Sequence, residues 1–174
     1  MHTPTRRRLA IAGAYAALVV CCLHIGASFY EHVVINTAWT YNPLVIESEQ
    51  SGVDRSLFWV PIQVCAALSL TVALFAGWYD RTARRWLLFA ALSYVAACLW
   101  MFVCWVPVRA VVEKRSELLL AELQSARIWL MASVLSTVLV LVSTWTLYHA
   151  ALRLESPAAG GSRRKLRPLG VAFR

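Results

Sequence analysis

The chain has 174 residues, of which 60% are hydrophobic and only 15% are charged, and its mean hydropathy is +0.60. Soluble domains carry roughly a quarter charged residues, and here the charges collect in short blocks between long apolar runs, so the composition excludes an ordinary soluble domain. The net charge of +8 does not indicate nucleic-acid binding, because basic residues are not interleaved with aromatic ones on a soluble face.

Four apolar runs are long enough to cross a bilayer, which takes roughly 20 residues of helix. They are predicted, in chain order, at about Leu9–Val34, Leu57–Trp78, Trp86–Val106 and Ala126–Ala150. The first run exceeds the roughly 7–15 residues of a signal-peptide core, so it is expected to be a span. The predicted fold is therefore all-α, a bundle of four transmembrane helices forming one domain over residues 1–152. Residues 153–174 are expected to form a basic, disordered cytoplasmic tail.

Positive charges between the runs predict the orientation. One side of the predicted topology holds twelve of the 17 Lys and Arg residues: Arg6, Arg7, Arg8, Arg81, Arg84, Arg85, Arg153, Arg163, Arg164, Lys165, Arg167 and Arg174. Most acidic residues fall on the other side. The positive-inside rule therefore places both termini in the cytoplasm.

The connecting segments predict how the helices begin and end. The turn between the second and third spans is short, so these helices are expected to be antiparallel neighbours. The third span is expected to stop at Pro107, and a long outer loop is expected over residues 35–56. Residues 116–123 favour helix, so the fourth span is expected to begin as helix before it enters the bilayer.

Ionisable groups near a span are the strongest functional indicators in a membrane protein. The first span carries His24, Glu31 and His32. At about 100° per residue, His24 and Glu31 share one face, and Ser28 lies between them on the same stripe. Glu31 and His32 are expected roughly 10 Å nearer the outer end than His24. An ordinary span end and a histidine bonded to a neighbouring helix are the non-functional alternatives.

The outer ends of the other spans are expected to bring polar and aromatic groups to the level of Glu31. The candidate catalytic residues are Glu31, His32 and Arg127, with a carboxylate or imidazole as general base and a guanidinium stabilising an anion. The candidate substrate-binding residues are His24, Ser28, Trp39, Trp59, Trp105, Arg109 and Trp129. Aromatic rings around a few convergent polar groups are typical of a small-molecule pocket.

No cofactor or metal is identifiable from the sequence. A di-metal carboxylate bundle needs several inward acids, whereas Glu31 is the one acid within a predicted span. His149 is expected at the cytoplasmic end of the fourth span, roughly a membrane thickness from Glu31, so they cannot share one metal ion. The five cysteines all lie in apolar runs without a C-x-x-C motif, which is typical of small buried side chains.

The segment Gly26–Ile35 (GASFYEHVVI), followed by Trp39, Asn42-Pro43 and Phe58-Trp59-Val60-Pro61, resembles bacterial four-span proteins of the DUF1772 type. Val106-Pro107-Val108 followed by Arg127 and Trp129 is similar too, so the resemblance covers about residues 10–150. This family includes anthrone oxygenase-like proteins. One departure is Arg109 with its neighbours, where the family pattern has an Asn after the Pro.

The resemblance implies a multi-pass protein of the bacterial cytoplasmic membrane. For a few members of the family it also implies a cofactor-independent oxygenase acting on a lipophilic aromatic substrate. Carried onto this chain, the site would lie at the outer mouth around Glu31, His32, Trp59 and Arg127.

Three functions remain open on the sequence. The first is an enzyme acting on a hydrophobic small molecule. The second is a small transporter, which would need an acid nearer mid-bilayer than Glu31. The third is a non-catalytic membrane component whose outer loops and fourth helix bind a partner, as a homo- or hetero-oligomer. In each case the lipid bilayer is the expected surroundings.

Overall fold

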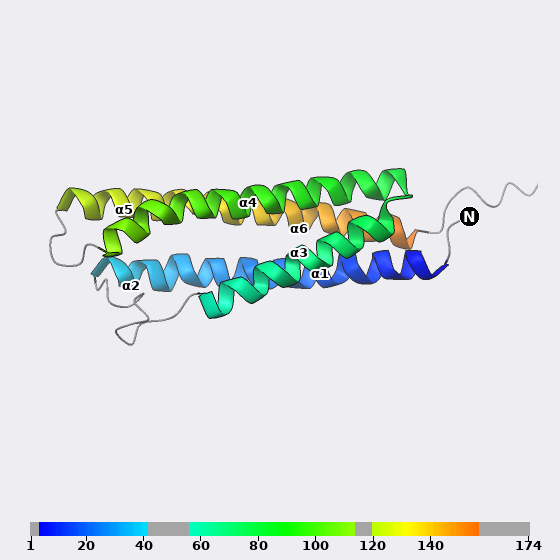
Figure 1. The fold of residues 1–174 in the computed structure, drawn as a ribbon, viewed down its shortest axis with the longest axis horizontal. Coiled ribbons are helices and arrows are strands. Elements are labelled where there is room, and N and C mark those ends of the chain that lie inside the picture. Colours follow the sequence, from blue (N-terminus) through cyan, green and yellow to red (C-terminus); the bar gives the residue numbers. More distant parts are fainter. Residues whose placement is uncertain (1–3, 42–55, 114–119, 157–174) are drawn as a thin grey trace, which may run out of the picture.

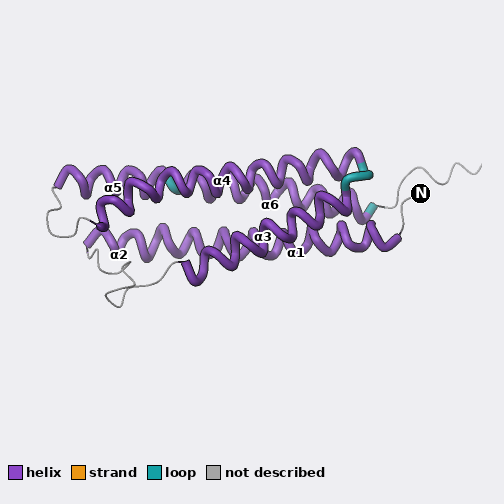
Figure 2. The backbone as a smooth tube through the Cα atoms, viewed as in Figure 1, coloured by secondary structure: helices purple, strands orange, loops and turns teal. Residues whose placement is uncertain are grey.

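The computed structural model describes residues 4–41, 56–113 and 120–156, and nearly all of these residues lie in helices (Figure 1). In chain order the elements are α1 (Pro4–Tyr30), the π-helical segment η1 (Glu31–Ile35), α2 (Asn36–Tyr41), α3 (Ser56–Gly77), α4 (Arg81–Glu113), α5 (Leu120–Ala132) and α6 (Val134–Glu155). The described part of the chain contains no strand (Figure 2). The all-α prediction is confirmed.

Four stretches of these helices are long and apolar enough to cross a membrane. They are Pro4–Ala38, Leu57–Gly77, Arg81–Val108 and Arg127–Glu155. The first helix starts at a proline, which is favourable because the first helical N–H has no partner in any case. The chain is therefore a multi-pass membrane protein built as a four-helix bundle, as the hydropathy pattern predicts. The predicted tail beyond residue 156 lies outside the described residues.

Two predicted helix ends are wrong. The first helical segment does not end before residue 35 but continues through η1 and α2 to Tyr41, because the first helix breaker on this side is Pro43. The helix of the third span does not stop at Pro107, because α4 continues to Glu113, although the stretch apolar enough to cross a membrane ends at Val108. A proline removes one backbone hydrogen bond, and transmembrane helices tolerate this when neighbouring groups re-satisfy the backbone. The predicted early start of the fourth helix agrees with α5, which begins at Leu120.

The tight turn between α3 and α4 is stabilised by Asp80. Its Oδ1 accepts hydrogen bonds from the backbone N–H groups of Thr82, at 2.9 Å, and Ala83, at 3.0 Å. These two contacts cap the first turn of α4. The predicted antiparallel connection is confirmed, but the two helices pack mainly elsewhere. α1 packs on α3 and α6, and α4 packs most extensively on α6.

Small side chains allow the helices to approach closely. Apolar burial provides little drive for association between helices in lipid, so small residues at the contacts and van der Waals packing do so instead. The fully buried small residues of the core include Ala10, Ala14, Ala17, Ala66, Ala73, Ala83, Ala90 and Ala150. At Gly13 a Cβ would lie 2.9 Å from the backbone nitrogen of Ala73, so α1 and α3 touch through backbone here.

The two terminal helices are joined at the end of the bundle that carries Pro4 and Glu155. The guanidinium of Arg7 donates to the backbone carbonyls of Leu154 (2.8 Å), Glu155 (2.8 Å) and Ser156 (3.0 Å). The hydroxyl of Tyr15 donates to Glu155 Oε1 at 2.8 Å. Carbonyls at a helix C-terminus have no partner within the helix, so Arg7 satisfies several of them.

Candidate functional site

A cavity of about 310 Å³ lies toward the end of the bundle opposite the Arg7 contacts. This volume is in the range of small-molecule sites, at its lower end. Its lining residues come from α1, η1, α2, α3, α4, α5 and the α5–α6 junction: His24, Glu31, His32, Asn36, Trp59, Gln63, Ala97, Cys98, Met101, Phe102, Cys104, Trp105, Val108, Trp129, Leu130 and Ser133. Every span therefore contributes to one site.

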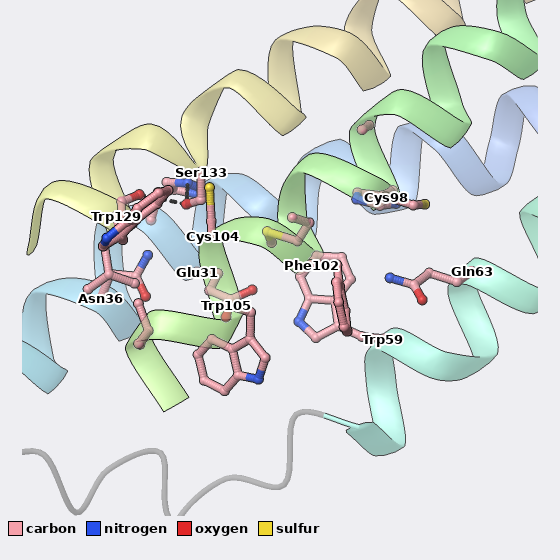
Figure 3. Close-up of a pocket in the computed structure, with 16 residues that line it drawn as sticks. Glu31, Asn36, Trp59, Gln63, Cys98, Phe102, Cys104, Trp105, Trp129 and Ser133 are labelled. Atoms are coloured by element: carbon pink, nitrogen blue, oxygen red, sulfur yellow. Dashed lines mark hydrogen bonds between the residues drawn. The ribbon is translucent and has the colours of Figure 1, made fainter. Parts of the chain in front are cut away.

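Aromatic and sulfur-bearing side chains form a large part of the cavity wall: Trp59, Phe102, Trp105, Trp129, Cys98, Met101 and Cys104. Figure 3 shows Trp59 from α3 and Phe102 from α4 next to each other, with Trp105 beside Glu31 and Trp129 farther along, beside Asn36 and Ser133. Phe102 is 68% exposed, so it borders the surroundings of the bundle as well as the cavity. One apolar side chain of α4 therefore lies both on the cavity wall and on the outer surface of the bundle.

His24 is one polar group within this wall. It is 5% exposed, and its Nδ1 lies 3.2 Å from the hydroxyl of Tyr94 on α4. Its ring also meets Trp59 edge to face, with centroids 4.9 Å apart. The hydrogen bond and the ring contact hold the imidazole in one orientation between α1, α3 and α4.

His32 is held by two hydrogen bonds. Its Nδ1 lies 2.6 Å from the backbone carbonyl oxygen of Ser28, one turn earlier, and its Nε2 lies 2.9 Å from Ser133 Oγ. Ser133 Oγ is also 2.6 Å from the carbonyl of Leu130. A hydroxyl has one proton and two lone pairs, so Ser133 can donate to the Leu130 carbonyl while it accepts from His32, or it can donate to His32 instead.

Glu31 begins the π-helical segment. The backbone N–H of Asn36 bonds the carbonyl of Glu31, five residues earlier, which widens the helix by one residue per turn. Segments of this kind occur frequently at functional sites. The Glu31 side chain is 5% exposed and lines the cavity together with His32 and Asn36. A carboxyl group so deeply buried within a span is costly in free energy, which favours a functional role.

The structure brings six of the predicted site residues to the cavity: His24, Glu31, His32, Trp59, Trp105 and Trp129. Ser28 is fully buried on the stripe predicted for it, between His24 and Glu31, and contributes its backbone carbonyl to the site. Arg127 is exposed and does not line the cavity. Trp39 and Arg109 lie on helices, but their side chains are outside the described part of the structure.

Sequence reasoning missed Ser133, Tyr94, Gln63 and Asn36. Gln63 could have been found, because it is the most strongly polar side chain in the apolar run of α3. Ser133 and Tyr94 carry no such signal, since serine and tyrosine are common in transmembrane helices. Their importance follows from the imidazole nitrogens that they contact on another helix.

The other histidine and the cysteines noted in the sequence do not form a second site in the described part of the chain. His149 stacks on Trp86, with ring centroids 5.1 Å apart, and Trp86 belongs to the first turns of α4 near the connection to α3. Among the residues described, no three His, Cys, Asp or Glu side chains are placed to hold a metal ion. All five cysteines are free, and Cys98 and Cys104 line the cavity.

Comparisons of the chain with protein-family models, with curated proteins and with solved structures find no match.

Proposed function

We propose that the chain binds a small lipophilic molecule in the cavity at the α2–α5 end of the bundle. The observation that carries this proposal is the composition of the wall, where four aromatic rings surround a few convergent polar groups. Such a combination orients a ligand through hydrogen bonds while its apolar body replaces water. Phe102, which is exposed and also lines the cavity, supports access from the bilayer, because the ligand would leave one apolar phase for another.

Filling the cavity tests this proposal. Met101→Trp places an indole in the space, and Leu99→Trp adds the same group to a neighbouring position that is 62% exposed. The purified wild type in nanodiscs is expected to retain a co-purifying lipophilic molecule, detected by native mass spectrometry. It is also expected to be labelled by a photoreactive naphthol at cavity residues. Leu99→Trp should keep both properties and Met101→Trp should lose both. Equal labelling of the two variants would contradict the proposal, provided that both melt as folded proteins.

A second candidate function is proton abstraction from the bound molecule, which the geometry around His32 favours. The Ser28 carbonyl can only accept, so His32 carries its proton on Nδ1 and presents a lone pair at Nε2 toward Ser133. A substrate proton passed to Ser133 Oγ would displace the hydroxyl proton to His32 Nε2, and the substrate would be left as an anion. Ser133 can then donate to Leu130, so the protonated imidazole keeps both partners.

This second proposal is compatible with the resemblance to anthrone oxygenase-like proteins, in which a substrate anion would react with molecular oxygen. It does not depend on that resemblance. Glu31 lines the same cavity, and an ionised carboxylate there would favour a positive imidazolium in that cavity. Arg127, exposed in the structure, has no part in this version of the site.

Hydrogen–deuterium exchange tests the abstraction without knowledge of the natural substrate. A ketone with acidic C–H groups, 2-tetralone, is expected to exchange its α-protons faster with wild-type protein in D₂O than with the protein-free nanodisc. His32→Gln should lower this rate by about 10²-fold or more, the usual contribution of a general base. Glu31→Gln should lower it while the protein remains folded. If both variants exchange the α-protons at the wild-type rate, proton abstraction is excluded but the ligand-binding proposal still stands.

A further inference from the structure

A second cavity lies at the other end of the bundle, beside the turn between α3 and α4. Figure 1 shows this turn at the same end as the start of α1. The cavity has a volume of about 450 Å³ and is lined by residues of the first turns of α4: Arg81, Thr82, Arg85, Trp86 and Phe89. It shares no lining residue with the cavity described above, so a ligand here would be independent of the function proposed there.

The lining residues change in character along the helix. Arg81, Arg85 and Phe89 are spaced four residues apart and so follow one another along one face of α4. Thr82 and Trp86 form the adjoining stripe. Each step of four residues advances about 6 Å along the helix axis. Two cations at the helix start are therefore followed by an indole and then by an aromatic ring, 62% exposed, that lies two turns into the span.

The two arginines of this cavity differ from their neighbours at the same end. Three other arginines are engaged: Arg7 by the carbonyls at the end of α6, Arg6 over the Tyr79 ring at 4.8 Å and Arg84 over the Trp78 ring at 5.0 Å. Among the residues that the structure describes, the guanidinium groups of Arg81 and Arg85 have no hydrogen-bond, ion-pair or aromatic partner. Both side chains are exposed and can therefore receive an anion.

The backbone at the start of α4 does not supply the anion site. Asp80 Oδ1 already accepts from the N–H groups of Thr82 and Ala83, at 2.9 and 3.0 Å. The Asp80 carboxylate offsets part of the positive charge, but Arg81 and Arg85 together leave the cavity with a net charge of one sign. An anion is thus expected on the arginine side chains and on the Thr82 hydroxyl, which can donate.

The indole of Trp86 is held in place by α6. The His149 ring stacks on it, with centroids 5.1 Å apart and an angle of 27° between the planes, and Trp145 meets His149 edge to face at 4.7 Å. Tryptophan is typical of the headgroup level of a membrane, because its ring is apolar and its N–H is polar. The cavity therefore has a fixed aromatic wall at the depth where lipid headgroups and acyl chains meet.

We propose that this cavity binds one anionic phospholipid, with the phosphate on Arg81 and Arg85 and the upper part of an acyl chain on Phe89. Guanidinium groups match phosphate oxygens in charge and in planar geometry. Basic clusters beside a span attract anionic headgroups. Phe89 favours a lipid over a free phosphate, because only a lipid has an apolar part that continues along the span. The inference does not depend on the function proposed for the other cavity.

Native mass spectrometry of the full-length, delipidated protein in detergent tests the site. Two lipids with the same chains are compared, dioleoylphosphatidylglycerol, which carries one negative charge, and dioleoylphosphatidylcholine, which has no net charge. The wild type is expected to bind the anionic lipid about tenfold or more tightly, since each arginine at an anionic surface contributes about fivefold. Free glycerol 1-phosphate in millimolar excess should not displace it.

Two double variants separate the site from the overall charge. Arg81→Gln/Arg85→Gln should reduce the preference for the anionic lipid to less than twofold. Arg8→Gln/Arg153→Gln removes two positive charges from exposed positions at the same end and should keep the preference. Phe89→Ala should weaken the binding of both lipids by severalfold, because both have the same acyl chains.

Each result supports or overturns a stated part of the proposal. A preference that survives in Arg81→Gln/Arg85→Gln, or that falls equally in Arg8→Gln/Arg153→Gln, would overturn the site. Displacement of the lipid by glycerol 1-phosphate, or unchanged binding in Phe89→Ala, would overturn the lipid as its ligand. If Arg81→Gln/Arg85→Gln does not melt cooperatively, Arg85→Gln alone replaces it and must lower the preference by about fivefold.

Discussion

His32 and Ser133 are 101 positions apart in the sequence, and their side chains meet at 2.9 Å between Nε2 and Oγ. This contact joins the first helical segment to the junction of α5 and α6. It also gives the base a partner that can change its hydrogen bond, because the Leu130 carbonyl lies 2.6 Å from the same hydroxyl.

Ser133→Ala should slow α-proton exchange of 2-tetralone by about tenfold or more. The change removes the hydroxyl that passes the proton, while the Ser28 carbonyl still holds His32 Nδ1. A residual rate is expected because water can take the vacated place. Ser136→Ala is the matched control, since Ser136 is buried one turn later and bonds the backbone of Ser133 rather than the imidazole. Equal rates for the two variants would show that Ser133 is structural.

The two histidines should show opposite tautomers in ¹⁵N NMR spectra of histidine-labelled protein at neutral pH. His24 is expected as the Nε2–H form, because the Tyr94 phenol has a proton to donate to Nδ1. His32 is expected as the Nδ1–H form, because the Ser28 carbonyl can only accept. His24→Gln and His32→Gln assign the signals by deletion. Tyr94→Phe should shift the His24 signals and leave those of His32 in place. Identical tautomers at both positions would contradict the assignment.

Gly13→Ala should destabilise the bundle, whereas Gly26→Ala should not. At Gly13 the new Cβ would meet Ala73 backbone atoms at 2.9 and 3.2 Å, and at Gly26 it would meet nothing within 4 Å. Overpacking costs about 1–3 kcal/mol, and the helix preference of alanine over glycine returns up to about 1 kcal/mol. Thermal unfolding in one detergent compares the two variants. A Gly13→Ala melting temperature at or above that of Gly26→Ala would exclude the close contact between α1 and α3.

Arg7→Gln should lower the melting temperature by a few degrees more than Arg8→Gln. Both changes remove one positive charge from the same helix turn. Arg7 also donates to three carbonyls at the end of α6, and Arg8 is an exposed neighbour. A loss of about 1 kcal/mol corresponds to roughly 2–4 °C for a chain of this size. Equal decreases in the melting temperature of the two variants would mean that the lost positive charge, and not the hydrogen bonds of Arg7, determines the loss of stability.

The fold could be predicted from the sequence because the length of an apolar run decides whether a helix crosses the bilayer. Two helix ends could not be predicted. The end of α4 was missed because Pro107 is tolerated inside the helix, and the end of the first helical segment was missed because residues 36–41 contain no strong helix breaker. A proline in a soluble helix usually marks an end. In a bundle of transmembrane helices a proline does not have to mark a helix end.

Half of the site could be predicted for a related reason. His24 and Glu31 share a helix face by their spacing alone, and the structure buries both. Their partners Tyr94 and Ser133 depend on how α4 and α6 are rotated about their axes. In lipid the outward faces are as apolar as the inward ones, as the exposed Leu92, Leu99 and Val138 show. Periodicity therefore does not indicate which face of a span meets another helix.

The π-helical segment Glu31–Ile35 has a consequence for the ancestry of the chain. A single π turn is equivalent to one extra residue within an α-helix, added without a change in the residues before or after it. A relative whose first helix is regular should therefore align with a one-residue gap between Glu31 and Asn36. Such gaps within a transmembrane helix are easily treated as alignment errors. Here the gap would separate chains that carry this arrangement of Glu31, His32 and Asn36 from chains that do not.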